Sequence, residues 1–201
     1  MEPPSHVFFD IGGVLGTNGW DTRQRAAAAA EFGLDGEFDA RHREIVGDWE
    51  LGRLTLDEYL DIAVFYEPRT FSREAFQDWM KAQSRPFPES VRLARRIAEA
   101  GRVWLFTLNN ESAALNQHRI DHFGLAGIFD AFLSSCWLGV RKPTPQIYAT
   151  ALAVTQATPE RSLFIDDRAQ NLAPAAARGM RTILYRNPAQ LEAELQKAGL
   201  L

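Results

Sequence analysis

The chain has 201 residues, of which 46% are hydrophobic and 24% charged, and its formal net charge is −4. That length is enough to bury a core, and it fits one domain or one domain with a sizeable insertion. The acidic balance, with no run of lysine and arginine, argues against nucleic acid as a partner. No apolar stretch approaches the ~20 residues that a membrane span requires, so we expect no membrane partner either.

The N-terminal segment and the cysteine content indicate a compartment. Met1 to Asp10 lacks a basic start followed by an apolar segment, so it does not read as a signal peptide. Cys136 is the single cysteine, which excludes an intrachain disulfide and suits a reducing compartment. The expected location is therefore cytoplasmic.

Short apolar runs alternate with helical patterns along most of the chain. The first run, VFFDI at Val7–Ile11, enters Gly12 and Gly13, as a buried strand does when it meets a turn. Four more predicted strands are Val103–Thr107, Ala131–Ser134, Ser162–Ile165 and Arg181–Tyr185. The predicted helices that accompany them are Pro88–Ala100, Glu111–Phe123, Thr144–Thr155, Leu172–Arg178 and Pro188–Ala198. This alternation predicts an α/β fold, a Rossmann-like parallel sheet with helices on both faces.

One connection is much longer than the roughly 30 residues of a βαβ unit. The surplus after the first strand reads as four helices: Asp21–Phe32, Glu37–Leu51, a segment capped by Thr55, and a segment capped by Ser72. We therefore predict a helical cap subdomain over residues 17–85, inserted into a catalytic core of residues 1–16 and 86–201.

Polar residues recur where the predicted strands end. Asp10 ends the first strand, and Asp166 and Asp167 end the fourth. Any one of them could be an ordinary turn residue. Ligands of an open parallel sheet bind beyond the carboxyl ends of its strands, and close carboxylates repel unless a cation lies among them. A divalent ion such as Mg²⁺ fits that requirement.

Four motifs in this order resemble the haloacid dehalogenase superfamily. They are DIGGVL at Asp10–Leu15, Thr107 after VWLF, RKPTPQIY at Arg141–Tyr148, and FIDDRAQN at Phe164–Asn171. The predicted cap resembles the helical (C1-type) cap of sugar-phosphate phosphatases, phosphomutases and 2-haloacid dehalogenases. The resemblance implies a Mg²⁺-dependent hydrolase, a phosphatase that acts on a small phosphorylated metabolite such as a sugar phosphate.

The resemblance also assigns roles. Asp10 is implied as the nucleophile that forms an aspartyl-phosphate, and Thr107 and Lys142 as catalytic contacts to the phosphoryl group. The implied metal ligands are Asp10, the Gly12 carbonyl, Asp166 and Asp167, with direct or water-mediated binding by Asp166 left open. Asn109 is a candidate hydrogen-bond donor to the phosphate of the substrate. Asn171 is expected to cap the helix that contains Pro174.

Gly12 departs from the usual phosphatase pattern, which has a second aspartate there as general acid and base. Such assistance contributes ~10²–10⁴-fold to rate. Three explanations compete: a leaving group that departs easily or receives its proton elsewhere, as in some sugar-1-phosphatases; a different electrophile, as in 2-haloacid dehalogenases; or a catalytically weakened protein that binds a phosphorylated ligand. The dehalogenase branch works without metal and usually lacks paired acids such as Asp166 and Asp167.

The cap segment DWELGRLTLDEY places Trp49 and Glu50 as candidate substrate-binding residues, whereas Tyr59 is expected to pack in the cap core. His42, His118 and His122 lack metal-ligand spacing and are expected on the surface or along a helix. We expect a monomer or a homodimer.

Overall fold

The computed structural model describes residues 2–201, and within them a five-stranded parallel sheet forms the centre of the larger part of the molecule. Its strands are β1 (His6–Phe9), β2 (Trp104–Asn109), β3 (Ala131–Ser134), β4 (Ser162–Asp166) and β5 (Arg181–Leu184). They lie in the order β3-β2-β1-β4-β5. The chain therefore leaves the central strand β1 toward one side and later returns to add β4 on the other, which makes the end of β1 a topological switch point.

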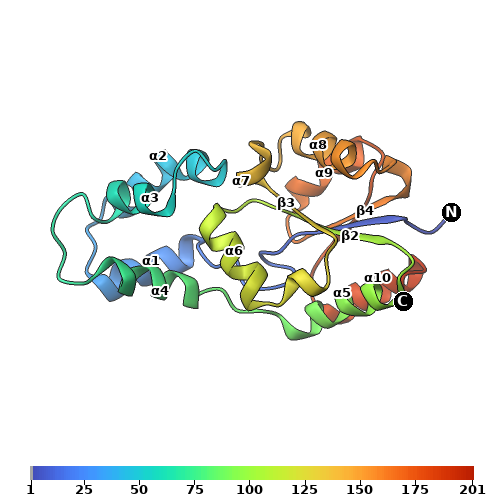
Figure 1. Ribbon diagram of the computed structural model, residues 1–201, viewed down its shortest axis with the longest axis horizontal. Helices are drawn as coiled ribbons and strands as arrows, with labels where there is room; N and C mark the ends of the chain where they lie inside the picture. Colours follow the sequence, from blue (N-terminus) through green and yellow to red (C-terminus); the bar gives the residue numbers. More distant parts are fainter. Residues whose placement is uncertain (1) are drawn as a thin grey trace.

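Helices cover both faces of the sheet (Figure 1). One face carries α5 (Pro88–Ala100) and α10 (Pro188–Lys197), and the other carries α8 (Pro145–Thr155) and α9 (Ala169–Ala177). The remaining elements around the sheet are α6 (Ala113–His122), η1 (Leu125–Gly127), α7 (Ser135–Leu138) and η2 (Pro159–Arg161). The predicted α/β, Rossmann-like fold is confirmed.

Alternating side chains of the strands build two hydrophobic cores. Val7 and Phe9 of β1 belong to a cluster with residues of α5 and α10, whereas Phe8 belongs to a cluster with residues of α8 and α9. All three side chains are fully buried. The continuous apolar run of β1 follows from this position, because a central parallel strand is covered on both faces.

Four further helices lie at one end of the molecule, away from the sheet (Figure 1). They are α1 (Thr22–Phe32), α2 (Phe38–Glu50), α3 (Leu56–Ala63) and α4 (Arg73–Ala82). Thr55 and Ser72 cap α3 and α4 through their side chains, as expected. These helices pack around a hydrophobic cluster of their own, which takes in Leu115 of α6 from the other part.

Two adjacent backbone segments connect the four helices to the sheet. Thr17 N–H donates to the Arg85 carbonyl at 2.9 Å, and Phe87 N–H donates to the Leu15 carbonyl at 2.8 Å. The chain thus leaves and re-enters the core at one place. The pairing lies at the predicted cap boundaries, residues 17 and 85, and the division into core and cap stays a prediction.

Two local expectations are wrong. Helix α9 begins at Ala169 rather than at Leu172, so Pro174 lies inside it and Asn171 is not its cap. The short helix α7 directly after β3 was not predicted. Within residues 2–201, no helix is both long and apolar enough to cross a membrane.

Candidate active site

The backbone fixes Asp10 at the switch point of the sheet. Its N–H donates to the Ile165 carbonyl of β4 at 2.9 Å, which continues the pairing of β1 with β4. The chain then turns back, and the N–H groups of Leu15 and Gly16 both donate to the Ile11 carbonyl. The Asp10 carboxylate accepts the Ile11 N–H at 2.8 Å. The carboxylate is therefore held at the carboxyl edge of the sheet before any ligand arrives.

A buried lysine lies between two of the predicted acids. Lys142 Nζ is 2.9 Å from Asp10 Oδ2 and 2.7 Å from Asp166 Oδ2. Burial alone would lower the pKa of Lys142, but the two carboxylates outweigh burial and raise it. Among the protein groups alone, burial raises the pKa of Asp10 to about 7, and the Lys142 ammonium opposes that rise. The charge of Asp10 therefore depends on nearby positive charge.

The acids also form a cluster with the spacing of a cation site. Oxygen atoms of Asp10, Asp166 and Asp167 all lie within 4.8 Å of one another. Burial and the neighbouring Asp166 raise the pKa of Asp167, and its Oδ1 is buried without a hydrogen-bond partner. Carboxylate oxygens are the ligands that Mg²⁺ prefers. The orphaned oxygen and the raised pKa values both fit a divalent cation held here.

Asp166 and Asp167 differ in what their oxygens already bind. Asp166 is fully buried and accepts hydrogen bonds from Lys142 Nζ, the Arg168 N–H and the Asn171 amide, which reaches both of its oxygens. Asn171 thus orients Asp166 instead of capping α9. With its acceptor positions filled, Asp166 is suited to hold Lys142, whereas Asp167 has an oxygen free for a cation.

Gly13 makes room for Asp167. Its φ is +78°, a left-handed conformation, and a Cβ built there would lie 2.3 Å from Asp167 Oδ2. No other residue type fits this position without moving the carboxylate.

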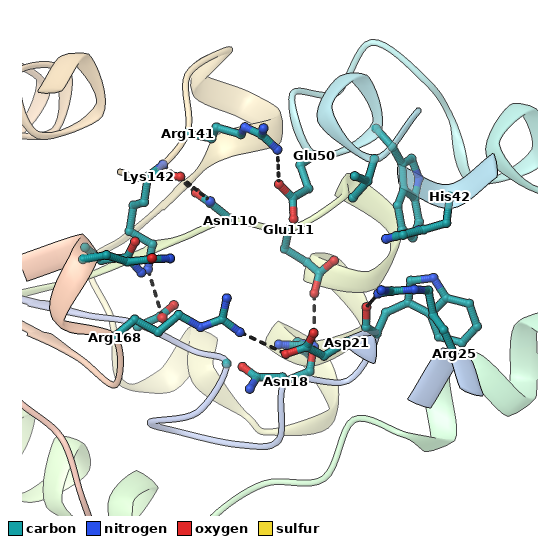
Figure 2. A pocket seen from close by; sticks show the side chains of 18 residues that line it. Asn18, Asp21, Arg25, His42, Glu50, Asn110, Glu111, Arg141, Lys142 and Arg168 are labelled. Atoms are coloured by element: carbon teal, nitrogen blue, oxygen red, sulfur yellow. Dashed lines mark hydrogen bonds and ion pairs between the residues drawn. The ribbon is translucent and has the colours of Figure 1, made fainter. Parts of the chain in front are cut away.

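A polar cavity of about 390 Å³ lies between the carboxyl edge of the sheet and helices α1 and α2 (Figure 2). Two ion pairs cross from core to cap around it: Arg141 to Glu50 at 2.9 Å and Arg168 to Asp21 at 3.0 Å. The two arginines directly flank Lys142 and Asp167 in the sequence. The cap thus closes over the acids through charged contacts.

Most of the residues predicted for the site surround this cavity. Asp10, Gly12, Lys142, Trp49 and Glu50 line it. Trp49 is almost fully buried and stacks on Tyr59, with ring centroids 3.9 Å apart, so most of it packs in the cap core.

Four predicted residues do not line the cavity: Asp166 and Asp167, described above, and Thr107 and Asn109. Thr107 is fully buried within β2, paired with Phe9, and its hydroxyl has no hydrogen-bond partner. Asn109 is also buried, and its amide donates to Asn116 Oδ1 at 2.8 Å. The strand continues past Thr107, so the first side chain after β2 that lines the cavity is Asn110. The catalytic role of Thr107 and the phosphate contact of Asn109 stay predictions.

Asn110 and Glu111 line the cavity and were not predicted. The Asn110 side chain holds the Lys142 backbone, donating to its carbonyl at 2.9 Å and accepting its N–H at 2.8 Å. The run of polar residues NNES after β2 was the available signal. His42 lies along helix α2, one of its two expected placements, and it is buried in the cap, with Nδ1 2.9 Å from the Tyr59 hydroxyl.

The sheet is doubly wound, and three acids and a buried lysine lie at its switch point. This combination suits a carboxylate that attacks a charged electrophile. The chain belongs to the haloacid dehalogenase-like hydrolase family, whose model matches residues 4–179. A segment of 69 residues, 34% of this chain, is 45% identical to bifunctional epoxide hydrolase 2 of Rattus norvegicus. That segment spans 12% of the relative's length.

Solved structures of this family share the fold. A HAD family enzyme of Bacteroides thetaiotaomicron, solved in complex with magnesium and inorganic phosphate, has a TM-score of 0.78 at 18% identity. That match covers 91% of this chain and 94% of the other. A dehalogenase solved with an intermediate complex has a TM-score of 0.64 at 21% identity, and the match covers 90% of this chain and 84% of the other.

Proposed function

We propose that the chain is a magnesium-dependent phosphatase that acts on a small phosphorylated metabolite through an aspartyl-phosphate on Asp10. The observation that carries the proposal is the arrangement of Asp10: a buried carboxylate at the end of β1, contacting Lys142 and lying within a cluster of three acids. A small polar substrate fits the cavity, which is lined mainly by charged and amide side chains. A sugar phosphate matches that lining, and the four inserted helices match a C1-type cap.

The chain's own groups account for the chemistry. The Asp10 oxygen attacks phosphorus, the bond to the leaving oxygen breaks, and water later displaces the phosphoryl group from Asp10. Lys142 neutralises charge on Asp10 and on the phosphoryl oxygens, and Asp166 and Asn110 hold Lys142 in place. Burial under the cap excludes bulk water, which strengthens these electrostatic contacts.

Magnesium would be held by Asp10 and Asp167, with the Gly12 carbonyl, and it would supply positive charge to the phosphoryl oxygens. A cation held by these residues would offset the repulsion among the three carboxylates.

The dehalogenase alternative is favoured by one observation, the absence of a side chain at Gly12. The intact acidic trio weighs against it, because a site that works without a cation has no use for the uncompensated Asp167 oxygen. A protein that binds a phosphorylated ligand without turnover is the third reading. The contact of Lys142 with Asp10 at 2.9 Å and the acidic cluster that joins Asp10 to Asp167 weigh against that reading.

A magnesium titration separates the three readings. The protein is assayed against a panel of phosphorylated metabolites and 2-haloacids, with Asp10→Asn as control. Phosphate release that requires magnesium and is absent in Asp10→Asn supports the phosphatase. Metal-independent halide release would replace it with a dehalogenase, and saturable phosphate binding without turnover would replace it with a binding protein.

A further inference from the structure

The space beside Gly12 is filled by side chains from elsewhere in the chain. A Cβ built on Gly12 would lie 2.8 Å from Asn18 Oδ1 and 3.4 Å from Arg119 Nη1. The backbone of Gly12 is not in a left-handed conformation, so the turn itself does not demand glycine. The absent side chain is therefore replaced in space by Asn18 and Arg119.

Neither replacement can transfer a proton, because an amide does not titrate and a guanidinium stays protonated. Arg119 nevertheless brings a third group to this place. Its Nη2 is 3.1 Å from Glu111 Oε2, and it also donates to the Asn18 carbonyl at 2.6 Å. Its Nε donates to Ser84 Oγ at 3.3 Å. Arg119 thus keeps two further acceptors if Glu111 becomes neutral.

Glu111 faces the cavity under conditions that suit proton transfer. Its side chain is 9% exposed and lines the cavity between Asn110 and Asn18 (Figure 2). The Ser112 N–H fixes Oε1 at 3.0 Å. Burial raises the pKa of Glu111 although Arg119 opposes the rise, and Glu50 adds to it. A phosphate dianion in the cavity would raise it further.

The other titratable groups of the cavity wall are otherwise engaged. Asp21 is paired with Arg168, and hydrogen bonding by the Thr22 N–H lowers its pKa despite partial burial. Glu50 is paired with Arg141 at 2.9 Å, and its side chain is 25% exposed, whereas that of Glu111 is 9% exposed. Burial lowers the pKa of His42 to about 4, so it carries no proton to donate near neutral pH.

We propose that Glu111, oriented by Arg119, is the general acid and base of this enzyme, in place of the carboxylate that Gly12 lacks. In the first step the Asp10 oxygen bonds to phosphorus, the phosphorus–oxygen bond to the leaving group breaks, and the Glu111 proton passes to that leaving oxygen. In the second step water bonds to phosphorus, the bond to Asp10 breaks, and one proton of that water returns to Glu111. The inference rests on the proposed phosphatase function.

Two substrates of similar shape test this assignment in the full chain with magnesium. The leaving phenolate of p-nitrophenyl phosphate needs no proton, whereas the leaving alkoxide of benzyl phosphate does. In Glu111→Gln, turnover of benzyl phosphate should fall ~10²–10⁴-fold. With p-nitrophenyl phosphate the variant should give a burst of nitrophenol at the wild-type rate, followed by slow turnover, because only the second step lacks its base.

The matched control is Asp21→Asn, the same chemical change at another carboxylate of the cavity wall. This variant should change the turnover of both substrates by the same factor and give no burst of nitrophenol. Glu111→Asp keeps a carboxyl group, so it should retain more activity on benzyl phosphate than Glu111→Gln. That difference separates the loss of the proton donor from a structural effect of changing Glu111. Equal losses on both substrates with no burst, or no loss at all, would overturn the assignment. A wild type that hydrolyses neither ester would instead refute the proposed function.

Discussion

Replacing Gly13 by alanine should weaken magnesium binding through Asp167. The built Cβ lies 2.3, 2.5 and 3.0 Å from Asp167 Oδ2, Cγ and Oδ1. The carboxylate must therefore move by about 1 Å to reach ordinary van der Waals separation. Mg²⁺ tolerates little departure from octahedral geometry, and disturbing a metal-ligand shell typically lowers affinity 10–100-fold. We expect the magnesium dissociation constant of Gly13→Ala to rise by at least about tenfold.

A control separates this contact from backbone strain. Gly101 also has a left-handed φ, +61°, but a Cβ there would meet no atom within 4 Å. A left-handed alanine costs ~1–2 kcal/mol in either variant, so both should melt a few degrees lower. Only Gly13→Ala should lose magnesium affinity in calorimetric titration. Equal affinities in the two variants would refute the reasoning.

Three further outcomes follow from buried or bridging charges. Arg119→Met should lower the free energy of unfolding in urea by ~3–5 kcal/mol, because it leaves Glu111 buried without its partner, and adding Glu111→Leu should recover most of the loss. Burial lowers the pKa of His42 to about 4 in the folded protein, against an ordinary 6.5, so its contribution to stability is complete above pH 6.5 and is lost as pH falls toward 4. His42→Phe should therefore flatten the plot of melting temperature against pH between pH 6.5 and 4. An unchanged plot would contradict the burial argument. Arg168→Gln should change unfolding stability by under ~1 kcal/mol, because its pair with Asp21 is about half exposed, and a larger loss in urea would show that this pair holds the cap.

The fold followed from the sequence because its signals are local. The apolar run of β1 ends in two glycines, and the inserted helices carry side-chain caps such as Thr55 and Ser72. Periodicity and capping depend on neighbours within a few residues, so they can be read directly. The boundaries were less secure: α9 starts at Ala169, so Pro174 lies inside a helix, where proline is disfavoured and a sequence pattern does not predict it.

The acids of the site were predictable because they end strands, which is how Asp10, Asp166 and Asp167 were found. Lys142 was found through the motif RKPTPQIY, and the structure brings it together with these acids. Thr107 lies inside β2, because that strand extends two residues further than its apolar run, and the role of Thr107 stays a prediction. Glu111 was missed because the polar run NNES alone does not tell which of its side chains is buried and lines the cavity.

The most direct test of the central claim is to trap the phosphorylated enzyme. The protein is mixed with magnesium and p-nitrophenyl phosphate, quenched rapidly in acid, and reduced with borohydride, which converts an acyl phosphate to an alcohol. Peptide mass spectrometry should then find homoserine at position 10, and should find aspartate there when substrate is omitted. Turnover with unmodified Asp10, or with the modification at another acid, would contradict the account.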